Sequence, residues 1–187
     1  MYAALENIVN SAGLPPGAAE QLDRYVVTMN APRDSFLIRQ GQRCDHFYII
    51  EKGFARIFSV IEDKEITTLF ARENDVITST YALFTQTASN ENVEVLEDSV
   101  LLKINYKEFV TGCREHPNLF NLYRAIMEKY YLSLEERTLS LQFDSALERY
   151  RKLVLQHPFI LQRASLASIA SYLGMSPVTL SRMRAQL

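Results

Sequence analysis

The chain has 187 residues, and its 48% apolar content is ample for the core of one or two domains. It has no run of about eighteen apolar residues and no secretory signal pattern at its start, so we expect a cytoplasmic protein without a membrane segment. Cys44 and Cys113 lie too far apart to suggest a metal site or a disulfide framework, and the net charge of −2 is not that of a uniformly basic DNA-binding protein.

The first half of the chain has the pattern of short strands after a helical start. Residues 2–12 have a loose helical pattern, and Leu14-Pro15-Pro16-Gly17 leads into a short helix that ends near Tyr25. Short apolar runs then alternate with glycines and polar turns such as Glu62-Asp63-Lys64-Glu65, which predicts an antiparallel sandwich or barrel. The expected strands cover residues 36–38, 46–50, 54–60, 66–70 and 93–104.

Helical periodicity returns at Asn105, where Glu108 occupies a capping-box position. The longest helix is expected from Pro117 to about Leu141, with an apolar stripe wide enough to pack on both the β-domain and a partner helix. This stripe predicts a homodimer, and the alternative is a long helix buried within a monomer. The predicted dimer interface comprises Phe120, Tyr123, Met127, Tyr130 and Leu134.

The stretch from Ser165 to Leu187 has the pattern of a helix-turn-helix. Ser165 is an N-cap residue type in front of apolar residues at helical spacing, and Gly174 suits a left-handed C-terminal cap. Ser176 and Pro177 are the N-cap and first-position types of a second helix. Two such helices can place the second one in the DNA major groove, although an ordinary helical hairpin would show the same pattern.

A helical wheel divides the second helix into a packed face and an outward face. The face that should pack on the first helix carries Leu180, Met183 and Leu187. The outward side chains are Val178, Ser181, Arg182 and Ala185, with Thr179 and Arg184 on the two flanks. Arg182 is the candidate base reader because a guanidinium can bond both acceptors of a guanine, whereas flanking side chains would meet phosphates.

The charge is divided unevenly along the chain. Residues 145–187 contain six basic residues and one acidic residue, a net charge of +5, which leaves −7 for residues 1–144. A basic C-terminal module on an acidic body suggests that the module meets phosphate while the body does something else.

With strands, a long helix and a helix-turn-helix in that order, the sequence resembles the Crp/Fnr family of bacterial transcription regulators. The resemblance rests on FLIRQGQRCDHFYIIEKGFARIF and ARENDVITS in the front half and on LVLQHPFILQRASLASIASYLGMSPVTLSRMR at the end. It implies an α+β fold with a β-roll sensor domain (1–116) and flanking helices, a dimerisation helix (117–143) and a helix-turn-helix domain (144–187). Because the chain reaches Leu187 as the second helix ends, we expect little or no terminal wing. By this resemblance the groove-facing or phosphate-contacting positions are Ser176, Val178, Thr179 and Arg182.

The chain departs from this family where a cyclic nucleotide would bind. Nucleotide-binding members place a glycine-glutamate pair and then an arginine there, whereas this chain has Thr78-Ser79 and a residue near Ser89. A cyclic phosphate needs a cation or converging backbone donors to replace its hydration, and the segment between Glu73 and Leu102 has no lysine or arginine. We therefore expect neither cAMP nor cGMP binding and no cofactor. A pocket for another effector would be lined by Thr78, Ser79, Thr80, Tyr81 and Ser89, and the alternative is a solvated loop.

These observations predict a homodimeric transcription regulator that binds double-stranded DNA at a two-fold symmetric site. RNA polymerase and an unknown small-molecule effector are further candidate partners. A change where the β-roll meets the long helix would alter the relation of the two recognition helices. The alternative is a sensor or scaffold protein that uses the same parts for ligand or protein interaction without DNA. We expect no enzyme, because the three histidines lie far apart and no catalytic or metal motif is recognisable.

Overall fold

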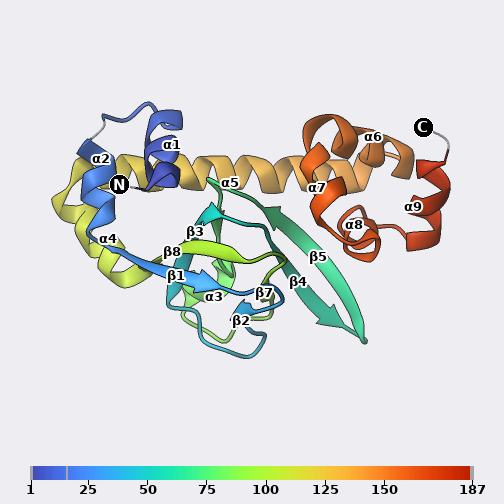
Figure 1. The fold of residues 1–187 in the computed structure, drawn as a ribbon, viewed down its shortest axis with the longest axis horizontal. Helices are drawn as coiled ribbons and strands as arrows, with labels where there is room; N and C mark the ends of the chain where they lie inside the picture. The colour runs from blue at the N-terminus through green and yellow to red at the C-terminus, as the bar shows by residue number, and fades with distance from the viewer. Residues whose placement is uncertain (1, 16, 186–187) are drawn as a thin grey trace.

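The computed structural model describes residues 2–15 and 17–185. A β-roll is followed by a long helix and then by a cluster of short helices, so the α+β architecture expected from the sequence is confirmed. In Figure 1 the long helix α5 (Pro117–Phe143) runs horizontally, with the N-terminal helices near its start and the C-terminal helices near its end. The β-roll lies on one side of this helix, between the two helical groups.

The β-roll consists of two antiparallel four-stranded sheets. One has the strand order β1-β8-β3-β6 and the other the order β2-β7-β4-β5, so β5 lies at an edge. The strands are β1 (Val26–Ala31), β2 (Phe36–Ile38), β3 (His46–Lys52), β4 (Ala55–Ile61), β5 (Lys64–Ala71), β6 (Val76–Ile77), β7 (Asn92–Val95) and β8 (Ser99–Asn105). A short helix, α3 (Thr80–Thr85), connects β6 to β7.

The main core lies between the two sheets and under the N-terminal helices. Strand β3 has a continuous apolar run because it is covered on both faces, on one side by the roll interior and on the other by α1 (Ala3–Ser11). Ile49 and Ile50 of β3 and Leu101 and Leu102 of β8 are fully buried, and the two strands pair antiparallel. Burial of this kind is the main stabilising contribution to the fold.

The start of the long helix is anchored by two neighbouring helices. Helix α2 (Gly17–Asp23) and helix α4 (Tyr106–Glu115) both contact α5, whose Leu119 and Leu122 are fully buried. The helix start expected at Asn105 is confirmed, since its side-chain oxygen accepts a hydrogen bond of 3.1 Å from the backbone N–H of Glu108. Further along, α5 becomes largely exposed. No helix within the described residues is both long and apolar enough to cross a lipid bilayer.

The C-terminal helices share a second core with the roll. They are α6 (Ala146–Gln156), α7 (Pro158–Arg163), α8 (Leu166–Tyr172) and α9 (Pro177–Arg184). The capping box predicted at Ser145 and Glu148 is confirmed, with both reciprocal hydrogen bonds present. Phe54 and Phe70 of the roll stack on each other and belong to the same buried cluster as Ile169 of α8. The C-terminal helices are therefore packed onto the roll.

The roll differs from expectation at several points, among them strands β1 and β6, which were not predicted. The single strand predicted over residues 93–104 is wrong, because Leu96-Glu97-Asp98 interrupt it and separate β7 from β8. Strand β4 is buried on both faces at its start, although the sequence predicted a half-buried strand. The reason is tertiary, since α8 packs against the neighbouring strand and a side chain of α8 reaches Arg56 of β4.

Candidate nucleic-acid interface and effector region

Local capping interactions build the helix-turn-helix expected from the sequence. The Ser165 hydroxyl accepts a hydrogen bond of 3.1 Å from the Ser168 backbone N–H and begins α8. Gly174 ends that helix in the left-handed region, with φ of +64°. The Ser176 hydroxyl accepts a 3.1 Å bond from the Thr179 backbone N–H, and Pro177 takes the first helical position of α9. These predicted caps are confirmed.

Helix α9 has the packed and outward faces that the wheel predicts. Leu180 is fully buried and Met183 packs on the same cluster, whereas Leu187 lies outside the described residues. The exposed residues include Ser176, Val178, Ser181, Arg182, Arg184 and Ala185, while Thr179 is half-buried and its hydroxyl lies 2.8 Å from that of Ser176. The helix thus exposes two guanidinium groups beside small hydroxyl-bearing side chains, a set able to contact phosphates and base edges.

Much of the positive charge of the C-terminal module is bound within the protein. Arg163 and Lys152 are ion-paired with carboxylates, and Arg149 donates to two backbone carbonyl oxygens at 2.7 Å each. The expectation that the basic module as a whole meets phosphate is therefore corrected for these three residues. Arg182 and Arg184 remain exposed on α9.

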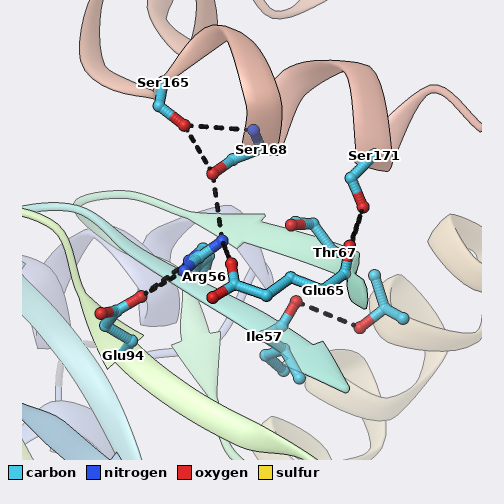
Figure 2. Close-up of polar contacts among 9 residues, drawn as sticks. Arg56, Ile57, Glu65, Thr67, Glu94, Ser165, Ser168 and Ser171 are labelled. Atoms are coloured by element: carbon cyan, nitrogen blue, oxygen red, sulfur yellow. Dashed lines mark hydrogen bonds and ion pairs between the residues drawn. The ribbon is translucent and has the colours of Figure 1, made fainter. Parts of the chain in front are cut away.

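Arg56 of β4 connects the roll to α8 (Figure 2). Arg56 is only 7% exposed. Its guanidinium lies 2.7 Å from a carboxylate oxygen of Glu94 and 2.7 Å from one of Glu65. The same group donates a 3.0 Å hydrogen bond to the hydroxyl of Ser168, and it lies over the ring of Phe58. A buried guanidinium needs partners of this kind because it has lost its hydration.

The edge strand β5 is also bonded to the C-terminal half of the chain. The Ser171 hydroxyl accepts a 2.9 Å bond from the backbone N–H of Thr67 and donates one of 2.7 Å to the carbonyl oxygen of Glu65 (Figure 2). Arg137 of α5 donates to the carbonyl oxygens of Thr67 and Tyr172, at 3.2 and 2.8 Å. Side chains thus bond the backbone that a further strand would otherwise pair with.

A third link joins α7 to the roll through Arg163. Its guanidinium forms two hydrogen bonds with the Glu73 carboxylate, both 2.9 Å, and two with that of Glu97, both 2.8 Å. These bonds hold the pKa of Glu73 at about 2, although partial burial opposes the shift. They also lower the pKa of Glu97 and raise that of Arg163. All three side chains are therefore charged at neutral pH.

The segment where a cyclic nucleotide would bind is closed by its own hydrogen bonds. Ser79 and Ser89 are buried, and the Ser89 hydroxyl donates to that of Ser79 at 2.9 Å. The Ser79 hydroxyl donates in turn to the Glu91 carboxylate at 3.1 Å. Burial raises the pKa of Glu91, which the Ser79 bond partly offsets. A carboxyl group therefore lies beside the two serines, and the segment between Glu73 and Leu102 has no lysine or arginine to pair with a phosphate there.

A separate cavity of about 600 Å³ lies between α5 and the roll. Thr78 and Thr80 line it, whereas Ser79 and Ser89 do not, and Tyr81 is 65% exposed at the surface. The predicted pocket residues are therefore not brought together in one place. Aliphatic and aromatic side chains make up most of the cavity wall, and the aromatic ones include Phe47, Phe84, Tyr106, Phe109, Tyr123, Tyr130 and Phe159.

The charged groups on the cavity wall have interactions of their own. Lys129 lies 3.0 Å from the Asp75 carboxylate, and the Arg72 guanidinium lies over the ring of Phe159. Burial lowers the pKa of His157, which favours its neutral form. The wall is thus mainly apolar, with a few polar groups, as small-molecule sites commonly are.

Known proteins share this architecture. Residues 28–116 match the family described as the cyclic nucleotide-binding domain. The chain is similar in structure to FixK2 from Bradyrhizobium japonicum (17% identity, 87% of this chain and 84% of that chain covered, TM-score 0.74). It is also similar to a protein from Eubacterium rectale that is described as a transcriptional regulator of the Crp/Fnr family (15% identity, 97% of this chain and 87% of that chain covered, TM-score 0.70). The chain has the fold of the Crp/Fnr regulators.

Other structures with the Crp/Fnr fold are similar over most of the chain. The catabolite activator protein of Thermus thermophilus has 18% identity and a TM-score of 0.60, with 96% of this chain and 85% of that chain covered. No curated protein matches the sequence. The Thermus thermophilus and Eubacterium rectale proteins are described as an activator protein and a transcriptional regulator, respectively.

The long helix of this Crp/Fnr fold divides the predicted dimer residues between two environments. Phe120 and Leu134 are 54% and 41% exposed, as an interface with a second copy requires. Tyr123, Met127 and Tyr130 line the cavity and thus face the roll. The exposed apolar side chains that the prediction did not include are Tyr131, Leu132, Leu139, Leu141 and Phe143.

Sequence reasoning missed the residues that join the helix-turn-helix to the roll. Arg56 stands in an otherwise apolar strand, and Arg137 interrupts the apolar stripe of the long helix. Each is a charged residue in an apolar pattern, and this irregularity was the only sign in the sequence of a buried polar contact. Their partners could not be found from the sequence, because Arg56 and Ser168 are 112 residues apart in the chain.

Proposed function

We propose that the protein is a transcription regulator that binds double-stranded DNA through α9. The observation that carries this proposal is the exposed face of α9, with Arg182 and Arg184 on a helix held in place by buried Leu180. A helix of this kind, preceded by a first helix and a glycine turn, fits the major groove. Arg182 would read a base, and Ser176, Thr179 and Arg184 would contact the backbone, with Val178 and Ser181 facing the groove.

In this proposal the chain acts as a homodimer through the exposed face of α5. Phe120, Tyr131 and Leu134 are large apolar side chains with exposures of 54%, 65% and 41% on one helix. Such a surface is stabilised when a second copy covers it. A two-fold axis along α5 would present two α9 helices to two half-sites, as paired helix-turn-helix proteins do. The domain division at residues 116 and 143 belongs to the same proposal, as does a cytoplasmic location.

The test is a fluorescence-anisotropy titration against sites selected from a random DNA pool. Arg182→Ala is expected to cost about 1–3 kcal/mol and to relax specificity at one position, because a bidentate base contact is lost. Arg184→Ala should weaken binding to all sequences and reduce the salt slope by about one. Arg114→Ala is the matched control, an exposed arginine on α4 near the start of α5 (Figure 1). Equal affinity of all four proteins would refute the assignment and favour the scaffold alternative.

We also propose that no cyclic nucleotide regulates this protein. The support is the Glu91 carboxylate among buried Ser79 and Ser89, and the lack of a lysine or arginine between Glu73 and Leu102. An effector would instead enter the aromatic cavity beneath α5. Millimolar cAMP should leave both the unfolding temperature and the DNA affinity unchanged. A dose-dependent rise of the unfolding temperature at micromolar cAMP would overturn this part.

A further inference from the structure

The first helix of the helix-turn-helix is bonded to two adjacent strands of the roll. Arg56 on β4 reaches Ser168, and the backbone of β5 at Thr67 and Glu65 bonds to Ser171 (Figure 2). We call this group of five residues the α8 junction. Ser168 and Ser171 are three residues apart and therefore lie on one face of α8. That whole face is held against the sheet.

The α8 junction is built from groups that are expensive to leave unpaired. Arg56 is 7% exposed and Ser168 8%, so both polar groups are shielded from water. The side chain of Glu94 is 12% exposed and depends on Arg56 for its countercharge. Breaking such a network leaves a buried donor or charge without a partner, which costs more than an exposed contact would. The junction therefore favours one orientation of α8 on the sheet.

Two further links restrict the same orientation. Arg163 bonds two carboxylates of the roll from α7, and Arg137 of α5 bonds both Thr67 and Tyr172. Bonds to the roll are thus made from α5, α7 and α8, at separate points. Because several contacts hold it, α8 cannot rotate about any single one of them. Helix α9 follows rigidly, since fully buried Leu180 belongs to the same core as Ile169 of α8.

None of the α8 junction bonds involves α9, so the face of α9 that carries Arg182 stays exposed. We propose that the α8 junction is a specificity determinant, with Arg56 as a positioning residue: it fixes the angle of α9 to α5 and thereby the half-site spacing that a dimer accepts. This inference rests on the proposed DNA-binding function. In this inference, residues that do not touch DNA decide which sites are bound. They discriminate between sites that have the same half-sites but a different separation between them.

The spacing consequence follows from the geometry of the double helix. Half-sites that face one side of the duplex lie about 34 Å or 10 base pairs apart, and one added base pair moves the second half-site by about 3.4 Å and rotates it by about 35°. A pair of rigidly held α9 helices cannot follow that rotation. A pair with a weakened α8 junction keeps its links through Arg163 and Arg137 but loses the bonds of α8 itself, so it can follow part of that rotation.

The experiment measures dimer affinity for a series of two-fold sites whose half-site separation changes by single base pairs. Two changes weaken the α8 junction: Arg56→Lys keeps the charge near Glu94 but loses the planar fork, and the double change Ser168→Ala with Ser171→Ala removes the α8 hydroxyls. Arg43→Lys is the matched control, because Arg43 is also ion-paired on the roll, with Asp45, but lies at the surface. A DNA carrying a single half-site reports on α9 itself, and thermal unfolding reports on folding.

For the unchanged protein and Arg43→Lys, affinity should fall about tenfold or more for one base pair away from the best spacing, since one half-site is then lost. In both junction variants, this loss of affinity should be at least threefold smaller. Their affinity for the DNA with a single half-site should be unchanged. A profile as steep as that of the unchanged protein, in a folded variant, would overturn the inference and leave the proposed function intact. Tighter binding at every spacing would also overturn it, because the junction would then be inhibitory. If the unchanged protein bound none of these sites specifically, the proposed function itself would be refuted.

Discussion

The ion pairs of Arg163 predict a pH-dependent contribution of Glu73 to stability. The Glu73 pKa falls from 4.5 to about 2 on folding, mainly because of the hydrogen bonds from Arg163. Without solvent screening, this pKa shift would contribute about 3.4 kcal/mol to the free energy of unfolding. The Glu73 side chain is 36% exposed, so solvent screening reduces our expectation to about 1–2 kcal/mol. A depressed carboxyl pKa stabilises the fold above pH 4.5 and loses this effect as the pH falls from 4.5 towards 2.

Urea unfolding of Glu73→Gln and of the unchanged protein, followed by circular dichroism from pH 7 to pH 3.5, tests this reasoning. At pH 7 the variant should be less stable by about 1–2 kcal/mol, because glutamine keeps the shape but not the charge that Arg163 requires. The difference should shrink below pH 4.5. Glu62→Gln, at the exposed β4–β5 turn, is the control and should change stability by less than about 0.5 kcal/mol. A loss for Glu73→Gln of the same size at pH 7 and pH 3.5 would refute the electrostatic account.

Three other changes give independent checks. Gly53→Ala should destabilise the roll by about 2–4 kcal/mol in urea unfolding, because Gly53 has φ of +119° and an added Cβ would lie 2.0 Å from the Ser99 hydroxyl oxygen; equal stability would contradict that geometry. Leu180→Ala should cost about 2–5 kcal/mol and abolish DNA binding, since Leu180 is fully buried beneath α9, and intact DNA affinity would argue against α9 as the reading helix. Tyr131→Glu should convert dimer to monomer in light scattering, because a charge would enter the apolar face of α5, whereas an unchanged molar mass would place the interface elsewhere.

The helix-turn-helix could be predicted almost completely because its signals are local. N-cap serines, a first-position proline and a left-handed glycine act within a few residues of where they stand. Ser165, Gly174, Ser176 and Pro177 each occupy the structural position that their residue type predicts. The buried and exposed faces of α9 followed from periodicity alone, since α8 and α6 both pack against its apolar face.

The attachment of that module to the roll could not be predicted, because it depends on pairs that are distant in sequence. Arg163 is one of the six basic residues of the C-terminal module, but its guanidinium bonds Glu73, which lies 90 residues earlier in the chain. The two-sided burial of β4 has the same cause, since alternation describes a strand with one wet face and fails where another module covers that face. The cavity was missed because its walls come from elements spread over most of the chain.

The bonding of β5 by Ser171 and Arg137 also bears on how the roll would behave by itself. A fragment that ends before α6 would lack Ser171, and Thr67 would present a free amide hydrogen on the outermost strand. Unprotected outer strands recruit strands from other molecules and lead to sheet extension. The C-terminal module therefore also protects the roll from self-association, and a soluble fragment of the roll alone would need a charged or proline substitution in β5 to replace it.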